Sequence, residues 1–518
     1  MLRHFLTVGS WTMISRILGL VRDQILAAFM GAGGMQDAYQ VAVRLPNMFR
    51  NLFGEGALNS AFVPLFTETL TKDGQEEARL FARQALTLLL LWLLLLCVLG
   101  EIFMPEILRV IAPGFVADGY RYDLGVMLSR ITFPYLVLIC AAAMVSGILN
   151  GLHRFGMASA AYVMFNVVGI FFVLCLTPFL PSVAHAAAWG VTASGVIQLA
   201  LLVWSCQRAG FGLLPVFPRL TPRIRLLVKR MGPGLLGSGA TQINLTVNTI
   251  IGTLLPAGSV SLMYFADRLN QLPLGVLGAA AGTTLLPMLT RLLAEGDIDA
   301  LHKAQNQAID YVLMLTLPAT AGLMVLGTPM MLTLFAHGAF TSHDAVLSAQ
   351  ALRAYALGLP AFVLVKVLSP VFFARGDTVT PVRIGIGALV LNLVLSFLLM
   401  GPLQYMGPPL AASLAACMNA VLLASFLGHR DALRVDRITR RRIGIMCLAT
   451  MVMSLFLCAA LYFQPDFSVM GMFSRLILLG VDVSLGGGVY LAFLHVTGIV
   501  DITTLVGKIK RRFVGRRG

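Results

Sequence analysis

Long apolar runs follow one another along almost the whole chain, and short polar segments separate them. An α-helix needs about 20 predominantly apolar residues to cross the hydrocarbon core of a bilayer. No connection between the runs is long enough to hold a soluble domain. We therefore predict an all-α integral membrane protein with fourteen transmembrane helices. The predicted spans are residues 5–30, 36–68, 79–104, 122–150, 157–180, 184–207, 230–255, 259–290, 303–328, 346–374, 379–400, 405–428, 441–463 and 472–497.

The first two predicted spans carry charges that a lipid-facing helix should not contain. One arginine at the bilayer centre costs about 2.5–3.5 kcal/mol on the insertion scale, so we expect these side chains to face a polar interior. Arg16 and Asp23 share one helix face, whereas Arg22 points about 120° away from Arg16. Only part of the charge can therefore be neutralised within the helix. Pro46 is expected to kink the second span. The charges are Arg16, Arg22, Asp23, Asp37, Arg44, Arg50 and Glu55.

Composition supports the membrane assignment. The chain has 518 residues, of which 58% are hydrophobic and 12% charged, whereas soluble domains contain about 25% charged residues. The net charge of +15 would suggest a nucleic-acid partner in a soluble protein. Here the basic residues gather in loops on one side of the predicted spans, with clusters at 219–230, 437–442 and 508–517. Because cytoplasmic loops are rich in Lys and Arg, we place both termini in the cytoplasm and expect the clusters to contact anionic membrane lipids rather than nucleic acid.

Motifs for metal, nucleotide or phosphoenzyme chemistry are missing from the sequence. The seven cysteines show no CxxC spacing, the eight histidines are dispersed, and no GxxxxGK[ST] loop occurs. We therefore predict no catalytic residue, no metal, no cofactor and no ATP site. A transporter fits better than a membrane enzyme acting on polyprenyl phosphates, which would need an acidic or His-containing loop cluster. Membrane potential, Na⁺ and protons all remain open as energy sources.

The chain contains an internal repeat with an offset of about 224 residues. Arg44-Leu45 aligns with Arg268-Leu269, Pro134 with Pro360, and Asn166 with Asn392. Six spans separate the members of each pair, so the two copies have the same orientation in the membrane. The predicted segments are an N-lobe at 1–207, a basic linker at 208–229, a C-lobe at 230–428, a second linker at 429–440, a final helix pair at 441–497 and a basic tail at 498–518.

Charge differs between the two copies. Span 7 has amide and hydroxyl residues where span 1 has arginines, whereas span 8 keeps Asp267 and Arg268. Transporters built from repeats usually bind their substrate near the midplane where the repeats meet. Arginine forks match phosphate oxygens, so the expected ligand is a phosphate or pyrophosphate, and cationic drugs are disfavoured. The predicted substrate-binding arginines are Arg16, Arg22, Arg50 and Arg268. The predicted supporting or counter-ion residues are Asp23, Arg44, Glu55, Asp267, Gln242, Asn244 and Asn248.

Structural alternatives remain open for several of these residues. Arg44, Arg130 and Arg353 could extend to the membrane surface instead of facing a ligand. Asp23, Asp37, Glu55 and Asp267 are more typical of structural counter-ions than of proton carriers. The amides and hydroxyls of span 7 fit interhelical hydrogen bonding as well as they fit the lining of a binding site.

Three segments resemble the MurJ (MviN) family. They are SRILGLVRD at 15–23, DAYQVAVRLPNMFRNLFGEGALNSAFVP at 37–64 and YFADRLNQLPLGVLG at 264–278. Members of this family are bacterial lipid II flippases of the multidrug/oligosaccharidyl-lipid/polysaccharide exporter superfamily. The resemblance implies two six-helix lobes around a central cationic cavity, with the last two helices forming a lipid-facing groove. It also implies that Arg16, Arg22, Arg50 and Arg268 are required cavity arginines, and that Asp37 is a required acid of the same substrate-binding cavity.

The family function would be to flip lipid II, the undecaprenyl-pyrophosphate-linked peptidoglycan precursor, outward across the bacterial inner membrane by alternating access. This would place the chain in cell wall biogenesis, in association with the cell-wall synthesis machinery. An exporter of another lipid-linked glycan is the main alternative.

Overall fold

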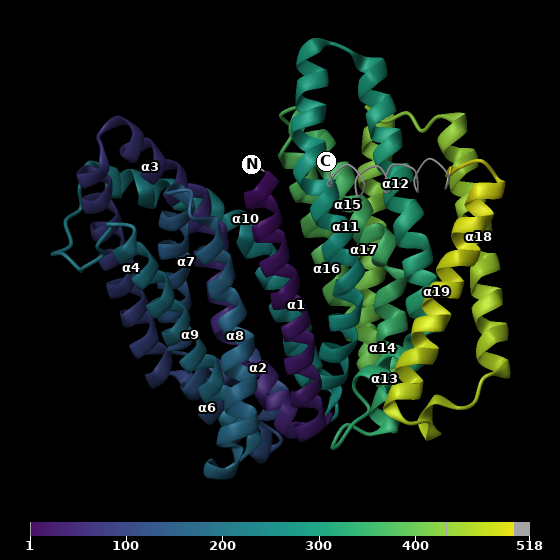
Figure 1. Ribbon diagram of the computed structural model, residues 1–518, viewed down its shortest axis with the longest axis horizontal. Coiled ribbons are helices and arrows are strands. Elements are labelled where there is room, and N and C mark those ends of the chain that lie inside the picture. The colour runs from purple at the N-terminus through teal and green to yellow at the C-terminus, as the bar shows by residue number, and fades with distance from the viewer. Residues whose placement is uncertain (1, 431, 502–518) are drawn as a thin grey trace, which may run out of the picture. The chain divides into compact units, whose positions relative to one another are not determined.

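The computed structural model describes the backbone of residues 2–430 and 432–501 (Figure 1). It describes their side chains except at 2–8, 54–57, 59–60, 233–241, 243–245 and 276–284. Within these residues every regular element is a helix, which confirms the all-α prediction. The structure forms two compact units, residues 1–261 with 337–340 and residues 262–336 with the chain from 341 onward.

The first unit contains the helices up to α10 and the start of α11. They are α1 (Leu2–Met30), α2 (Gly34–Phe49), the π-helix η1 (Arg50–Leu58), α3 (Asn59–Lys72), α4 (Gln75–Ile102), α5 (Met104–Ile111), η2 (Pro113–Phe115), α6 (Gly119–Thr132), α7 (Tyr135–Gly151), α8 (Phe155–Leu176), η3 (Thr177–Phe179), α9 (Val183–Arg208) and α10 (Pro222–Thr253).

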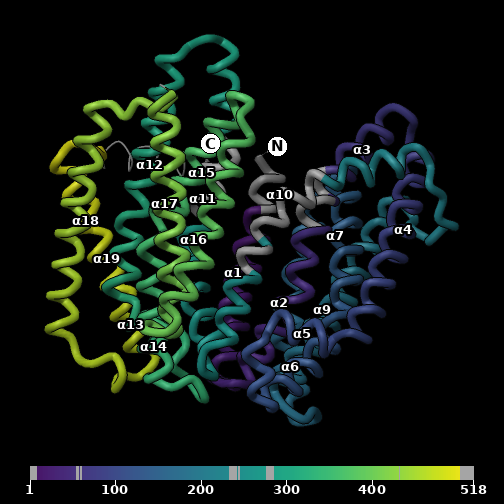
Figure 2. Tube along the Cα trace, turned by 180° about the vertical axis from the view of Figure 1, so that it is seen from behind, coloured from purple at the N-terminus to yellow at the C-terminus, as the bar shows by residue number. Residues whose placement is uncertain are grey.

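The second unit contains the remaining helices. They are α11 (Ser259–Glu295), α12 (Ile298–Val325), α13 (Gly327–Leu334), α14 (Ser342–Leu357), α15 (Leu359–Ala374), α16 (Val379–Leu403), η4 (Gln404–Met406), α17 (Gly407–His429), α18 (Arg437–Phe463), η5 (Phe467–Val469) and α19 (Met472–Val496). Figures 1 and 2 both show α18 and α19 side by side at one flank of this unit.

Nine helical stretches in the described part of the chain are long and apolar enough to cross a membrane. The charged helices α1, α10 and α11 are not among them. One stretch, Val379–His429, contains both α16 and α17. The integral membrane character is therefore established, and the count of fourteen spans stays a prediction.

The compact units do not divide where the predicted lobes do. The seventh predicted span, α10, belongs to the first unit because it packs against η1 and α3. Two polar contacts mark this packing: Asn51 donates to Gln242 at 3.5 Å, and the Thr246 hydroxyl lies 3.1 Å from the Met48 sulfur. The predicted lobes follow the sequence repeat, whereas the compact units follow the packing, so the lobe boundaries stay a prediction.

Pro46 interrupts the hydrogen bonding of α2, as the sequence predicts. Proline has no N–H, so the carbonyl four residues earlier, that of Ala42, loses its usual partner. The Thr132 hydroxyl of α6 donates to the Ala42 oxygen at 3.0 Å, and the Asn47 side-chain Nδ2 donates to the Val43 oxygen at 2.9 Å. Regular α-helix ends at Phe49, and the π-helix η1 follows. The predicted span 36–68 is therefore built from three helical segments.

The same arrangement recurs in the second unit. Pro318 lies inside α12 and removes the usual partner of the Met314 carbonyl. The Tyr490 hydroxyl of α19 donates to this carbonyl at 2.9 Å. A hydroxyl from a neighbouring helix therefore satisfies the carbonyl that each of these two prolines leaves free.

Polar contacts also fix α18 and α19 at their ends. Arg442 of α18 pairs with the buried Asp310 of α12 at 2.9 Å. Arg475 of α19 donates to the Leu332 carbonyl of α13 at 3.0 Å. The middle of both helices instead exposes apolar side chains such as Leu455, so these helices have a large lipid-facing surface.

Candidate functional site

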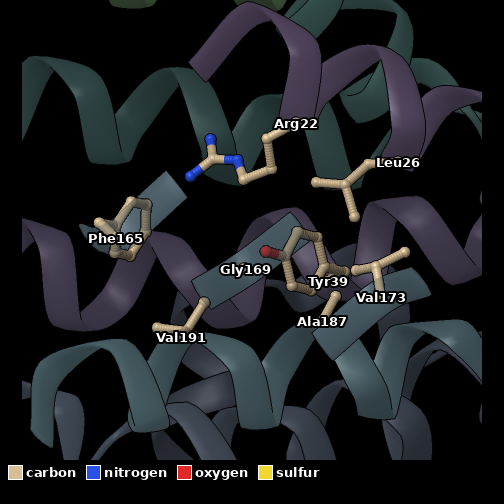
Figure 3. Close-up of a pocket in the computed structure, with 8 residues that line it drawn as sticks. All are labelled: Arg22, Leu26, Tyr39, Phe165, Gly169, Val173, Ala187 and Val191. Atoms are coloured by element: carbon tan, nitrogen blue, oxygen red, sulfur yellow. The ribbon is translucent and has the colours of Figure 1, made fainter. Parts of the chain in front are cut away.

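Arg22 and Asp23 form a buried ion pair in the C-terminal half of α1. The Arg22 Nη2 lies 2.8 Å from the Asp23 carboxylate, and both residues are at least nine-tenths buried. The guanidinium lies 4.9 Å from the centre of the Phe165 ring, toward which it extends in Figure 3. A small cavity beside it is lined by Leu26, Tyr39, Phe165, Gly169, Val173, Ala187 and Val191. Arg22 is therefore neutralised and held within the first unit.

Gly169 of α8 makes room for the Arg22 side chain. A Cβ at position 169 would lie 3.3 Å from the Arg22 Cδ, closer than an ordinary carbon contact. This close approach lets the arginine cross α8 and reach the Phe165 ring (Figure 3).

Arg16 lies on the same helix in a different environment. Its side chain is exposed, and it has no hydrogen-bond or ion-pair partner among the described residues. Helix geometry places Asp23 on the face of Arg16, but in the structure Asp23 pairs with Arg22. Arg16 has no such counter-ion among the described residues. An exposed guanidinium in a predicted membrane span suits an anionic ligand.

Arg50 begins the π-helix η1 and is half-buried. Its Nη2 donates to the Asn51 side chain at 3.1 Å, and Asn51 in turn contacts Gln242 of α10. Arg44, two residues before Pro46, is also half-buried. These two arginines and Gln242 belong to the first unit, together with Asn248, which is half-buried on α10.

Asp37 is fully buried and accepts hydrogen bonds from the start of α11. The Gly258 N–H donates at 2.7 Å, the Ser261 N–H at 2.8 Å and the Ser261 hydroxyl at 2.5 Å. Arg121 of α6 lies 3.8 Å away. A carboxylate at a helix N-terminus satisfies N–H groups that lack a partner within the helix and interacts favourably with the helix dipole. This geometry favours a structural capping role for Asp37 over direct substrate binding.

Two glycines of the first unit, Gly338 and Gly114, lie in close contact with backbone carbonyls. The Ala339 N–H donates to the Ala28 carbonyl at 2.7 Å. At the neighbouring Gly338, whose φ is 61°, a Cβ would lie 2.3 Å from that oxygen. A Cβ at Gly114 would lie 1.9 Å from the Thr253 carbonyl. Backbone therefore meets backbone at two points, and neither tolerates a side chain.

Arg268 is the predicted arginine of the second unit. Its Nε and Nη2 donate to the Tyr264 hydroxyl at 3.0 and 2.9 Å, and its guanidinium lies 5.1 Å from the centre of the Tyr264 ring. Next to it, Asp267 accepts a hydrogen bond from Gln271. Tyr264 thus orients the half-buried Arg268 without neutralising its charge.

Some predicted residues lie outside what the structure describes. The side chains of Glu55 and Asn244 are in this group. Among the described residues, no three His, Cys, Asp or Glu side chains lie close enough to hold a metal ion. The predicted lack of a cofactor remains a prediction.

Three contributing residues were not identified from the sequence. Arg121 lies just before the predicted span 122–150, and Thr132 carries no charge or motif. Ser261 could have been found from the repeat, because 261 − 37 = 224 is the offset that relates the two copies. Asp37 therefore binds the residue that occupies its own position in the second copy.

Comparison with known proteins gives consistent results. The family described as "Lipid II flippase MurJ" matches residues 26–478. A probable lipid II flippase MurJ of Rhizobium tropici is 36% identical, covering 99% of this chain and 97% of that protein. The corresponding protein of Rhizobium meliloti is 39% identical over 90% and 87% of the two chains. The lipid II flippase MurJ of Burkholderia cenocepacia is 33% identical over 83% of each.

Solved structures share the fold. A lipid II flippase MurJ in an inward closed conformation superposes with a TM-score of 0.78 at 24% identity, covering 95% of this chain and 98% of that chain. An inward-facing multidrug resistance MATE family transporter superposes with a TM-score of 0.69 at 16% identity, covering 82% and 97%. At these identities the likeness concerns the fold alone.

Proposed function

Because this chain belongs to the lipid II flippase MurJ family, we propose that it moves lipid II from the cytoplasmic to the outer leaflet of the bacterial inner membrane. The family consists of transporters, so the chain is a membrane transporter and not an enzyme. Its role in peptidoglycan and cell wall biogenesis follows from that substrate.

Arg16 is exposed and has no partner among the residues that the structure describes, and this observation best supports an anionic ligand. A pyrophosphate carries several oxygens that guanidinium forks can bind in pairs, and a low dielectric strengthens that pairing. Arg22 differs because Asp23 already neutralises it, which supports a role in orienting α1 rather than in contacting substrate. Arg50 and Arg268 complete the proposed set of cavity arginines; Arg50 donates to Asn51 and Arg268 donates to Tyr264.

The proposed mechanism is alternating access. The pyrophosphate enters from the cytoplasmic leaflet, and the arginines replace its hydration. The ligand's negative charge then reduces repulsion among the arginines, which permits closure and reopening to the outside. The polyprenyl chain stays in lipid along α18 and α19, whose exposed apolar side chains support this path; these include Met451, Leu455, Ile477, Val481 and Leu485.

Orientation and energy source belong to the same proposal. The basic clusters between the helices support cytoplasmic termini through the positive-inside rule. Membrane potential or a monovalent cation would supply the energy, and the cell-wall synthesis machinery would be the protein partner.

The test is to measure outer-leaflet lipid II in bacteria depleted of their own flippase and supplied with this chain or its Arg16→Ala variant at matched membrane levels. We expect the parent chain to restore exposure and Arg16→Ala to fail. Arg109→Ala is the matched control, because Arg109 is also exposed but lies on α5, outside the proposed set.

Arg16→Lys separates charge from geometry. A lysine keeps the cation but loses the planar fork, so partial activity indicates a general cation and full loss indicates bidentate binding. Restored exposure with Arg16→Ala would contradict the assigned role of Arg16. If the parent itself restores nothing, another lipid-linked glycan becomes the preferred substrate.

A further inference from the structure

Residues 209–221, here called the strap, connect α9 to α10 and lie against the beginning of α4. The strap is packed against the first unit, because its residue Phe211 is fully buried and its ring lies 5.6 Å from that of Phe66, centre to centre. Three hydrogen bonds tie the strap to α4: Arg79 Nη2 to Gly210 O at 2.5 Å, Arg83 Nε to Leu214 O at 2.6 Å, and Val216 N to Thr87 Oγ1 at 3.2 Å.

These contacts determine where the strap lies along the axis of α4. Residues 79, 83 and 87 are spaced about one turn apart, so the strap follows the helix axis for about 12 Å. Immediately after Thr87, α4 becomes an uninterrupted apolar run over residues 88–99. Such a change from polar to apolar sequence marks where the hydrocarbon core begins. The strap therefore reaches the boundary between headgroups and acyl chains at Val216.

Large apolar side chains of the strap are exposed on both sides of Val216 in the sequence. Leu214 is 70% exposed, Phe217 is 83% exposed and Leu220 is 63% exposed. In water, three such side chains on one short segment would form an unfavourable apolar patch. At the membrane interface they can insert among the lipids, and an aromatic residue is especially suited to that zone.

Exposed cations lie near the apolar side chains in the sequence. Arg219 lies in the strap, and Arg225, Lys229 and Arg230 lie on the first turns of α10, all exposed. Arg223 is different because it pairs with Asp73 at 2.6 Å. The apolar and basic residues together form the composition of a segment that binds an anionic membrane surface.

We propose that the strap is a membrane anchor that selects anionic phospholipids. Phe217, flanked by Leu214 and Leu220, inserts into the acyl boundary of the leaflet at this end of α4. Arg219 and Arg225 bind the phosphates of anionic lipids beside it. The connection between α9 and α10 is thereby held at a defined depth in the membrane. This inference does not depend on the transported substrate.

Insertion can be tested with a Phe217→Trp variant of the full chain in nanodiscs containing lipids brominated along their acyl chains. Bromine quenches tryptophan only on close approach, and the signal of the four native tryptophans is subtracted using the parent chain. We expect the added fluorescence to be quenched. Leu220→Trp reports on the same surface from a second exposed position.

Two matched variants calibrate the depth. Gln75→Trp places the reporter at the exposed first residue of α4, about 18 Å along the helix from Thr87, and should not be quenched. Phe397→Trp lies within the apolar helix α16, is 51% exposed and should be quenched strongly. If Phe217→Trp and Leu220→Trp behave like Gln75→Trp, the strap lies in water and the proposal fails.

Lipid selectivity is tested in the Phe217→Trp background. Brominated phosphatidylglycerol should quench more than brominated phosphatidylcholine at the same mole fraction. Adding Arg219→Gln and Arg225→Gln should reduce this preference by about fivefold per removed cation. Because the readout is local, the basic clusters elsewhere do not affect it. Equal quenching by both lipids before these changes would overturn the anionic selectivity, provided that thermal unfolding shows the variants to be folded.

Discussion

Arg16 and Arg22 show how far two identical residues on one helix can differ. Arg22 has an acidic neighbour, a facing aromatic ring and a glycine that gives it room. Arg16 has none of these among the described residues. Asp23 offsets the free-energy cost of placing the Arg22 guanidinium in a membrane span. For Arg16, a bound anion would offset the same cost.

Asp377 offers a test at the level of a single side chain outside the predicted spans. It accepts hydrogen bonds from the Thr380 N–H at 3.0 Å, the Thr380 hydroxyl at 2.7 Å and Arg430 at 2.6 Å. The Thr380 N–H, with help from Arg430 and the Thr380 hydroxyl, lowers the pKa of this carboxyl well below its ordinary value. The ionised form is therefore the one that stabilises the fold.

We predict that Asp377→Asn lowers the unfolding temperature slightly at pH 7 and that the difference from the parent shrinks below about pH 4. A carboxyl with a lowered folded pKa contributes stability above its unfolded pKa of about 3.9 and loses it as the pH falls toward the folded pKa. Thermal unfolding at pH 7 and pH 3.5 measures this. Arg430→Gln, which keeps both Thr380 contacts, should cost less. A difference that does not change with pH would contradict the assignment.

At the scale of elements, two prolines interrupt the hydrogen bonding of their helices, and a hydroxyl from a neighbouring helix compensates at each. Thr132 serves the Ala42 carbonyl near Pro46, and Tyr490 serves the Met314 carbonyl near Pro318. A buried carbonyl without a partner is costly, so each hydroxyl joins a neighbouring helix to the bend. Through Tyr490, α19 is bonded to α12 at its proline.

We predict that Tyr490→Phe destabilises the protein by about 0.6–1.7 kcal/mol, the range of hydrogen bonds between membrane helices. Tyr462→Phe is the matched control, because Tyr462 is 84% exposed on α18. Thermal unfolding of both variants gives the comparison.

A double-mutant cycle tests the physical reason. Pro318→Ala returns an N–H to the Met314 carbonyl, so in that background Tyr490→Phe should cost much less. An unchanged cost would mean that Tyr490 stabilises α19 by packing and not through the proline bend.

Sequence patterns predicted these elements unevenly. Hydropathy and Pro46 predicted a kinked helix in the region 36–68, because both are local signals. The π-helix η1 was not predicted, since its packing against α10 joins residues such as Asn51 and Gln242 that are far apart in the chain. The Arg22–Asp23 pair was missed for a similar reason: ideal helix geometry separates adjacent side chains, whereas a long arginine can reach back to its neighbour.

At the scale of the whole molecule, the repeat predicted from sequence reappears in specific contacts. Gly114 meets the carbonyl of Thr253, and Gly338 meets the carbonyl of Ala28. The two glycines are 338 − 114 = 224 positions apart, and the two carbonyls are 253 − 28 = 225 apart. Each copy therefore supplies one glycine and one helix end. Sequence alignment could relate these positions, but only the fold shows that they touch.

We predict that Gly114→Ala and Gly338→Ala each destabilise the protein by about 1–3 kcal/mol, because the added Cβ displaces backbone that cannot move aside. Gly119→Ala should be nearly neutral, since nothing lies within 4 Å of its Cβ position. Thermal unfolding of the three purified variants measures the differences. Equal stability of Gly114→Ala and Gly119→Ala would show that the junction is not tightly packed.

The reciprocal contacts of Gly114 and Gly338 also suggest how the repeat arose in evolution. A contact in which position i of one copy meets position j of the other, and j meets i, is the pattern of a two-fold homodimer. Here both halves of that pattern lie in a single polypeptide. A duplicated ancestral half would have made the same junction with a second copy of itself, and fusion allowed the two copies to diverge. The two copies differ at Asp37, whose counterpart in the second copy is Ser261, the residue that donates a hydrogen bond to it.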